Sequence, residues 1–337
     1  MSDVKRPFID ALDPAAPPPG LEGAVVALGN FDGLHRGHKG VIARAQALAR
    51  AMRKPCAVLT FEPHPADFFA ARSVIFRLTP PEAKAALLAR LGLDGMIRLT
   101  FDARLAALTA AEFTADILSR RLGVSAVVAG YDFRFGAARQ GDADFLRADG
   151  ARLGFGVEIV ERIVKDEAGS LDAVSSTATR EALERGDVAL ANGLLGRPYF
   201  IEGVVVHGEK RGRGLGFPTA NIVLDPSNRL RHGVYAVTLE ARGVVHGGVA
   251  SFGRRPTFDN GPPLLEVFVF DFSGDLYGEM VEVAFHGFLR GEEKFTSLDA
   301  LIAQMHADST AARAILARER AGREEALHPS GSLPRRV

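Results

Sequence analysis

The sequence has little cysteine, no net charge and no long apolar segment, and each absence excludes a class of protein. Cys56 is the single cysteine among 337 residues, so an intrachain disulfide and a CxxC metal or redox motif are excluded. The 41 basic residues balance the 41 acidic ones, which argues against nucleic acid or an anionic membrane as a partner. No apolar run approaches the roughly 20 residues of a membrane helix. We expect a cytoplasmic protein whose anion sites are local.

Strand and helix patterns alternate along the first half of the chain, which predicts an α/β fold with a doubly wound parallel sheet. The expected strands are 24–28, 56–61, 95–99 and 125–130, and the expected helices are 41–52, 79–91 and 109–122. Thr79 is a candidate helix cap, with Pro80 at the first helical position. Residues 1–22 are expected to form a loose entry arm. Ligands of such sheets bind beyond the carboxyl ends of the strands, so His38, His64 and the segment after Gly130 are expected to converge.

The stretch 28–38 connects the first of these strands to a helix and contains three glycines and two histidines. Glycines let a ligand approach the backbone, and the first amides of a helix attract anions. His35 and His38, three residues apart, would share one face of that helix. A zinc site lacks further ligands, and the glycine order differs from a dinucleotide fingerprint. Phosphate binding and a purely structural glycine turn both stay open.

Two later segments of the first half offer polar groups to the same region. The loop 130–142 carries Asp132 between aromatic residues that suit a planar ring, although its phenylalanines would equally plug the core. The segment 174–180 supplies hydroxyls and Arg180 at the start of a helix, which is either a second anion site or simply a capped helix.

After residue 199 the pattern changes to short strands, which predicts a small antiparallel barrel. The expected strands are 200–207, 233–241, 244–252, 264–272 and 277–285. Thr296 and Asp299 are expected to form a capping box at the start of a terminal helix, and residues 319–337 to be a disordered tail.

The barrel half has its own candidate site around a glycine-rich basic loop at 207–221. Such a loop can hold phosphates, and Thr219 and Asn221 offer uncharged oxygens to magnesium. Glu266 is a carboxylate on an otherwise apolar strand and is a candidate general base, unless it simply faces solvent. A solvated hairpin and a nucleic-acid contact are the other interpretations of the loop.

Ten motifs, taken in order, resemble the prokaryotic bifunctional riboflavin kinase/FAD synthetase family over residues 23–316. They are GNFDGLHRGH at 29–38, TFEPHP at 60–65, GYDFRFG with RQGD at 130–142, SSTATR at 175–180, LLGRPY at 194–199, GFPTAN at 216–221, GVY at 233–235, RRPTF at 254–258, LEV at 265–267 and FLRGEEKF at 288–295. The resemblance implies an FMN adenylyltransferase domain of the nucleotidylyltransferase type over 23–186. A riboflavin kinase domain, a Greek-key barrel with a C-terminal helix, would follow over 187–318.

The resemblance also implies substrates and residue roles. Riboflavin and ATP would give FMN in the second domain, and FMN and ATP would give FAD and pyrophosphate in the first, with Mg²⁺ as cofactor. The implied catalytic residues are Glu266, His35, His38 and Arg180. Nucleotide and phosphate contacts are implied for Gly29, Phe31, Asp32, Gly37, Ser176, Thr177, Gly212, Gly214, Gly216 and Pro218. Flavin contacts are implied for His64, Pro65, Asp132, Phe133, Phe135 and Arg290, and metal ligation for Thr219 and Asn221.

Three positions depart from the family pattern. Thr179 replaces an aliphatic residue, Ser251 stands where an asparagine is expected, and Phe268 where a histidine is expected. None of the three carries a chemical role above, so the departures concern rate and flavin affinity. The oligomeric state stays open.

Overall fold

The computed structural model describes residues 7–161, 174–207, 217–253 and 263–327, with side chains as far as residue 322. Its contacts divide the chain into two units, Met1–Ala178 and Thr179–Val337. The division falls inside a helix, before the boundary at residue 186 that the sequence suggested. No helix within the described ranges is long and apolar enough to cross a membrane.

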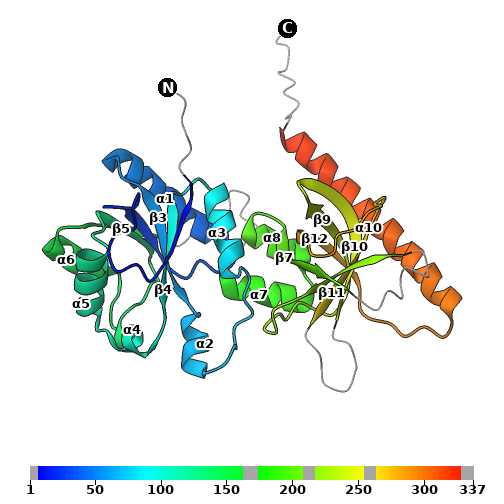
Figure 1. The fold of residues 1–337 in the computed structure, drawn as a ribbon, viewed down its shortest axis with the longest axis horizontal. Helices are drawn as coiled ribbons and strands as arrows, with labels where there is room; N and C mark the ends of the chain where they lie inside the picture. The colour runs from blue at the N-terminus through cyan, green and yellow to red at the C-terminus, as the bar shows by residue number, and fades with distance from the viewer. Residues whose placement is uncertain (1–6, 162–173, 208–216, 254–262, 328–337) are drawn as a thin grey trace, which may run out of the picture. The chain divides into compact units, whose positions relative to one another are not determined.

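The first unit is built on a six-stranded sheet in which every neighbouring pair is parallel. Its strands are β1 (Ile9–Leu12), β2 (Val25–Leu28), β3 (Cys56–Glu62), β4 (Gly95–Thr100), β5 (Ala126–Gly130) and β6 (Gly156–Val160), in the order β1-β4-β3-β2-β5-β6. The doubly wound parallel sheet expected from the sequence is confirmed (Figure 1). Strand β2 lies in the middle with all four residues buried, so the turn that follows it is held at the centre of the sheet's carboxyl edge.

Helices pack on this sheet and form the hydrophobic core with it. They are α1 (Arg36–Met52), α2 (Pro65–Ala70), α3 (Pro81–Arg90), α4 (Ala103–Ala107), α5 (Ala110–Glu112), the π-helix η1 (Phe113–Arg121), the 3₁₀ turn η2 (Ala137–Arg139) and α6 (Ala143–Leu153). One face of α1, including Val41, Ile42 and Ala45, is buried and packs on β2 and β5. Phe113 and Leu118 of η1 join a core cluster with alternate residues of the strands.

Two expectations for the first unit are corrected. Residues 9–12 are not part of a loose arm, because β1 pairs with β4 and Leu21 is 1% exposed. Thr79 does not cap the helix that follows it, which begins at Pro81 after Pro80 as N-cap. Its hydroxyl instead accepts a hydrogen bond from the Gly33 N–H.

The second unit contains a closed barrel of six antiparallel strands, in the order β10-β11-β8-β7-β12-β9. The strands are β7 (Tyr199–Val206), β8 (Thr219–Val223), β9 (Gly233–Ala241), β10 (Val244–Gly253), β11 (Leu264–Val269) and β12 (Met280–Arg290). The helices are α7 (Ser176–Arg185), which begins in the first unit, α8 (Val188–Leu195) and α10 (Leu298–Leu327). The predicted barrel and terminal helix are confirmed, whereas β8 was not predicted as a strand.

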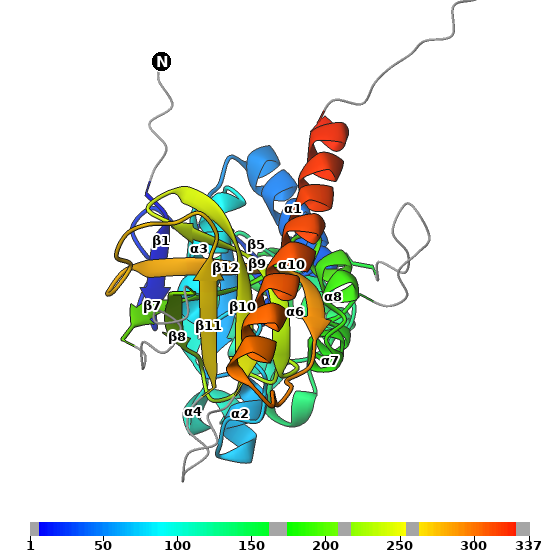
Figure 2. The same ribbon diagram turned by 90° about the vertical axis from the view of Figure 1, so that its right-hand side faces the viewer.

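Helix α10 lies along the barrel and contacts β9, β10 and β12 (Figure 2). Two glycines make room for it, since a Cβ on Gly247 would lie 3.0 Å from Leu316 and one on Gly287 would lie 3.1 Å from Ile315. The helix begins one residue after Ser297, whose hydroxyl accepts the Ala300 N–H, so the predicted cap at Thr296 is wrong. It continues to Leu327, into the segment expected to be disordered.

Candidate active sites

The turn between β2 and α1 has a backbone that few residue types adopt. Phe31, Gly33 and Leu34 have positive φ angles of 50°, 87° and 45°. Such conformations cost a non-glycine residue about 1–2 kcal/mol and are retained only where the surroundings impose them. The Phe31 ring is buried below Gly29, where an added Cβ would lie 3.3 Å from it. The turn is therefore a constrained structure in which Gly29 leaves room for the Phe31 ring.

His35 and His38 lie together at the start of α1. His35 is the N-cap, its Nδ1 accepts the His38 N–H at 3.2 Å, and the two rings stack with centroids 3.6 Å apart. Because Nδ1 accepts, a neutral His35 ring carries its proton on Nε2. A side chain on Gly37 would contact the His35 ring at 3.1 Å, so glycine is needed there. The structure thus brings the two predicted histidines together at a helix N-terminus.

The side chain of Asp32 is buried and hydrogen-bonded within the protein. Its side chain is 2% exposed, and its carboxylate accepts the backbone N–H groups of Leu78 and Thr79 at 3.0 and 2.9 Å. Its backbone carbonyl accepts the Ser176 hydroxyl at 2.8 Å. Asp32 thus joins the turn to the segment before α3 and to the first residue of α7, and its nucleotide contact stays a prediction.

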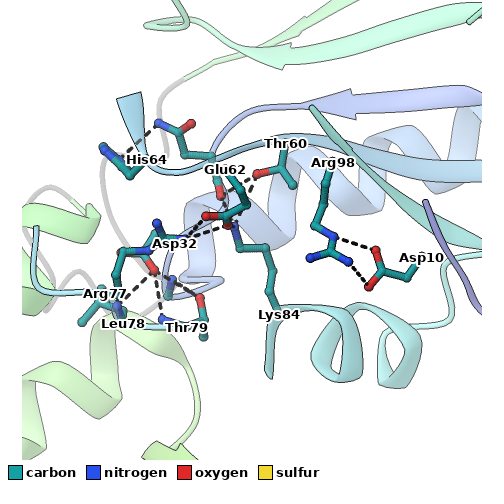
Figure 3. A network of polar contacts seen from close by, with 12 residues as sticks. Asp10, Asp32, Thr60, Glu62, His64, Arg77, Leu78, Thr79, Lys84 and Arg98 are labelled. Atoms are coloured by element: carbon teal, nitrogen blue, oxygen red, sulfur yellow. Dashed lines mark hydrogen bonds and ion pairs between the residues drawn. The ribbon is translucent and has the colours of Figure 1, made fainter. Parts of the chain in front are cut away.

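A buried ionic network lies beneath the turn and was missed by the sequence reasoning (Figure 3). Both carboxylate oxygens of Glu62 lie 2.6 Å from Arg77 Nη2, and Lys84 Nζ lies 3.1 Å from Glu62 Oε1. Burial opposes the charged form of Arg77, but Glu62 outweighs it and raises the pKa of Arg77. Burial lowers the pKa of the Lys84 ammonium, against the pull of Glu62. The sequence offered one sign of this network, which is that Lys84 occupies a position of α3 where the helical spacing predicts an apolar residue.

The ends of β3 and β5 flank the turn in the sheet order and bring the predicted flavin residues to the same edge. His64 caps α2 through Nδ1, with Pro65 as the first helical residue, and its Nε2 lies 3.4 Å from the Asn30 side-chain amide. Asp132 is exposed on the other side, after β5. The expected convergence of these segments is therefore present.

The paired phenylalanines after β5 have different environments. Phe133 and Phe135 stack with centroids 5.8 Å apart, but Phe135 is 6% exposed and belongs to the core cluster. A Cβ on Gly141 would lie 2.7 Å from the Phe135 ring. The Phe135 ring therefore packs in the core, which favours the core-plugging alternative for this residue, while Phe133 is only partly buried; the flavin contacts of both stay predictions.

Helix α7 begins with the predicted hydroxyl segment. Ser175 Oγ accepts the Ala178 N–H, Ser176 Oγ donates to Asp32, and Thr177 is exposed. Arg180 follows Ser176 by one helical turn and belongs to the second unit. Thr179, one of the departures, is fully buried.

In the second unit, Glu266 lies in a row of polar residues across the barrel. Its register partners are Asn221 on β8 and Ser251 on β10, and cross-strand partners share a face of a sheet. The alternate partners, Leu265 and Ile222, are both 0% exposed, so the barrel core lies on the opposite face. Glu266 therefore faces outward, next to Asn221.

Asn221 has the environment expected of a cation ligand. It is 3% exposed and its Nδ2 donates to the Thr219 carbonyl at 3.3 Å, while its buried Oδ1 has no hydrogen-bond partner among the described residues. A buried acceptor without a donor is costly, and a carboxamide oxygen is a ligand that hard cations accept. Thr219 is half-buried at the start of β8, after the exposed Pro218. These residues fit Mg²⁺.

Part of the predicted kinase site lies outside the described residues, namely Gly212, Gly214 and Gly216. Arg290 ends β12, where its Nε and Nη2 donate to Asp308 of α10 at 3.0 and 2.8 Å. The Asp308 carboxylate raises the pKa of Arg290. The Arg290 guanidinium lies 5.6 Å from the Phe295 ring centroid. Phe268, where a histidine was expected, packs edge-on against Phe217.

Comparison with known proteins gives the same division of the chain. A family model described as FAD synthetase matches residues 18–178, and one described as riboflavin kinase matches residues 195–316. The bifunctional riboflavin kinase/FMN adenylyltransferase of Pseudomonas fluorescens is 43% identical over 300 residues, covering 89% of this chain and 95% of the relative. The protein of that name from Escherichia coli K12 is 42% identical, covering 87% and 92%.

A solved structure from Streptococcus pneumoniae, titled a macrolide-efflux protein, is 35% identical and has a TM-score of 0.78. The similarity covers 91% of this chain and 99% of that one, so it extends over both units. Together, these matches show that the chain belongs to the bifunctional riboflavin kinase/FMN adenylyltransferase family.

Proposed function

We propose that the two reactions of the family take place at two sites, one at the carboxyl edge of the parallel sheet and one on the outer face of the barrel. The observation that supports this division most strongly is that each unit, one a parallel sheet and the other a barrel, has its own cluster of polar residues suited to phosphate chemistry. His35 and His38 stack at a helix N-terminus in the first unit, and Glu266 pairs with Asn221 in the second. We assign the adenylyltransferase domain to residues 23–186 and the kinase domain to 187–318.

At the first site an oxygen of the FMN phosphate attacks the α-phosphorus of ATP, and the bond to the pyrophosphate oxygen breaks. The nucleophile is already ionised, so the site needs to neutralise developing charge more than to remove a proton. His35 and His38 stabilise this charge, and the exposed Thr177 and the backbone at Gly29 and Gly37 contact the phosphates. Ser176 acts through its bond to Asp32.

The flavin of the first site contacts residues on either side of the turn. His64, Pro65, Asp132 and Phe133 are the proposed contacts. Phe69 of α2 is added to them, because it is 71% exposed and packs edge-on against Phe68 and Phe101. An exposed aromatic ring held by its neighbours is suited to stacking on a planar ligand.

At the second site the riboflavin 5′-hydroxyl oxygen attacks the γ-phosphorus of ATP, and ADP leaves. Glu266 accepts the hydroxyl proton as general base. Thr219 and Asn221 hold Mg²⁺, which when bound neutralises charge on the phosphate oxygens. Phosphate contacts of Pro218 and of glycines 212, 214 and 216 are proposed from the family resemblance alone, and Arg290, fixed by Asp308, contacts the flavin.

The substrates riboflavin, FMN and ATP are small molecules, and we propose that the enzyme acts in the cytoplasm without nucleic acid or membrane. This agrees with the single cysteine and the balanced charge of the sequence.

The experiment is product analysis by chromatography. The purified chain is incubated with riboflavin, ATP and Mg²⁺, and in parallel with Mg²⁺ replaced by EDTA. FMN followed by FAD is expected in the first reaction and neither product in the second. FMN without FAD, or FAD only from supplied FMN, would show that one of the proposed sites is inactive.

A further inference from the structure

A buried lysine lies beneath the turn of the first site. Lys84 is 1% exposed and belongs to the buried face of α3, together with Ala83, Leu87 and Leu88. Moving an ammonium out of water costs several kcal/mol. An apolar residue of similar size is often as good for stability or better. The charge at this position therefore calls for a reason other than packing.

The ammonium of Lys84 is directed to the backbone of the turn. Lys84 Nζ donates to the Asn30 carbonyl at 2.9 Å, which is the shortest of its three contacts; Glu62 Oε1 is at 3.1 Å and Thr60 Oγ1 at 3.4 Å. The Thr60 hydroxyl also donates to the Asn30 carbonyl, at 3.1 Å. Two donors thus hold one carbonyl oxygen, as many as its two lone pairs accept.

Fixing this carbonyl also fixes the next backbone N–H. In a trans peptide the C=O and the following N–H point in opposite directions, and the peptide between Asn30 and Phe31 is trans. The Phe31 N–H is therefore turned away from Lys84. It has no hydrogen-bond partner within the described ranges of the chain. Phe31 is 1% exposed, and a buried backbone donor without an acceptor calls for one that a ligand can supply.

We propose that Lys84 is a positioning residue for adenylyl transfer, which aims the Phe31 N–H at an oxygen of the α-phosphate of ATP by holding the Asn30 carbonyl. This inference rests on the proposed function, because it takes the turn as the triphosphate site. Lys84 touches no substrate and acts through Asn30. A preorganised backbone donor at developing charge is effective because it needs no reorientation during the reaction.

A purely structural role for Lys84 makes a different prediction. Glu62 and Asp32 bring two negative charges to the network and Arg77 and Lys84 two positive ones. Lys84→Met alone leaves an excess negative charge, whereas Glu62→Gln with Lys84→Met restores the balance. If charge balance were all that mattered, the double variant would recover activity. If Lys84 positions the peptide, it would not.

The experiment compares Lys84→Met, the Glu62→Gln/Lys84→Met double variant, Thr60→Val and the control Arg98→Met. Arg98 donates two hydrogen bonds to Asp10 at the β1–β4 pair of the same sheet, and within the described ranges its side chain makes no hydrogen bond or ion pair with the turn. FAD formation from FMN is measured with ATP and with each α-thiophosphate diastereomer of ATP, whose sulfur accepts hydrogen bonds poorly. Riboflavin phosphorylation by the same proteins reports on the second unit.

In the two Lys84 variants we expect kcat for FAD formation to fall about 10- to 100-fold, with the KM for FMN unchanged. The ratio of rates with ATP and with the sensitive diastereomer should move toward one, because the donor that distinguishes oxygen from sulfur is no longer aimed. Thr60→Val removes one of the two donors without changing charge and should move the same ratio in the same direction. Arg98→Met should change neither.

Full activity in the double variant would overturn the inference. So would a thio effect that is unchanged in both Thr60→Val and the double variant, since a loss of folded protein lowers both rates equally. Should the Lys84 variants fail to fold, Thr60→Val decides alone. His38→Ala distinguishes failure of the Lys84 inference from failure of the proposed function. FAD formation by that variant would overturn the proposed adenylyltransferase site itself.

Discussion

Replacing Asp32 tests whether its carboxylate supports the turn or contacts the nucleotide. The side chain is buried and accepts the Leu78 and Thr79 N–H groups, while the Thr79 hydroxyl lies 3.3 Å from Oδ1. Asp32→Ala leaves these backbone donors without their acceptor. The local structure before α3 should therefore open more often, although Asp32 is 46 residues away from Leu78 in the sequence.

The size of the effect follows from the number of lost bonds. A hydrogen bond to a charged group contributes about 1.5–3 kcal/mol. Two such bonds give at least about 3 kcal/mol, which corresponds to roughly a 150-fold change in the opening equilibrium at about 1.4 kcal/mol per tenfold. Asp32→Asn keeps one acceptor oxygen, so about half of this free energy, or roughly a tenfold change, is expected.

The assay is amide hydrogen exchange at Leu78 and Thr79, measured together with the KM for ATP in FAD formation. Asp67→Asn is the matched control, because Asp67 Oδ1 accepts the Val74 and Ile75 N–H groups at 2.7 and 2.8 Å. It should speed exchange at 74–75 only. Unchanged exchange at 78–79 in Asp32→Asn, with a KM for ATP raised more than about tenfold (a charged contact), would refute the structural role.

Further outcomes are expected at four residues. Glu266→Gln should lower FMN formation by about 100-fold or more while sparing FAD formation from supplied FMN. His38→Ala should do the reverse, and loss of both products in either folded variant would contradict the division. Asn221→Ala should raise the Mg²⁺ concentration needed for half-maximal kinase activity about tenfold, measured by metal titration. Burial raises the pKa of Cys56 to about 12, so the native thiol should resist alkylation at pH 8 and react after unfolding. As pH rises, the thiol ionises in the unfolded chain first, at a pKa of about 8.5. The free energy of unfolding, measured by urea titration, should therefore fall as pH rises above that value.

Local patterns were sufficient for most of the fold because many of its strands are continuously apolar or alternate between buried and less buried residues. β2 and β3 are largely aliphatic and buried. In β9 and β10, buried residues alternate with less buried ones over part of the strand. β1 was missed because four residues at the sheet edge have no distinctive pattern and are strands only through pairing with β4. β8 was missed because it follows a glycine-rich basic segment and begins with polar residues.

The candidate sites were predicted in part for a similar reason. The histidines and glycines of the turn are close in sequence, so a short motif contains their spacing. The network beneath them joins Lys84 to Asn30 and Glu62 across 54 and 22 residues, and no local pattern announces such contacts. Phe133 and Phe135 are equivalent in sequence, and only the packing of Phe135 against Phe113 and Phe145 distinguishes the core ring from the partly buried one.

The central claim is that one unit makes FMN and the other makes FAD. Its most direct test is FAD formation from riboflavin by Glu266→Gln, by His38→Ala and by an equimolar mixture of the two. Neither variant alone should make FAD from riboflavin, and the mixture should, because FMN released by His38→Ala is the substrate of the intact first site of Glu266→Gln. FAD from either variant alone, or none from the mixture when both proteins are folded, would contradict the assignment of the two reactions to two sites.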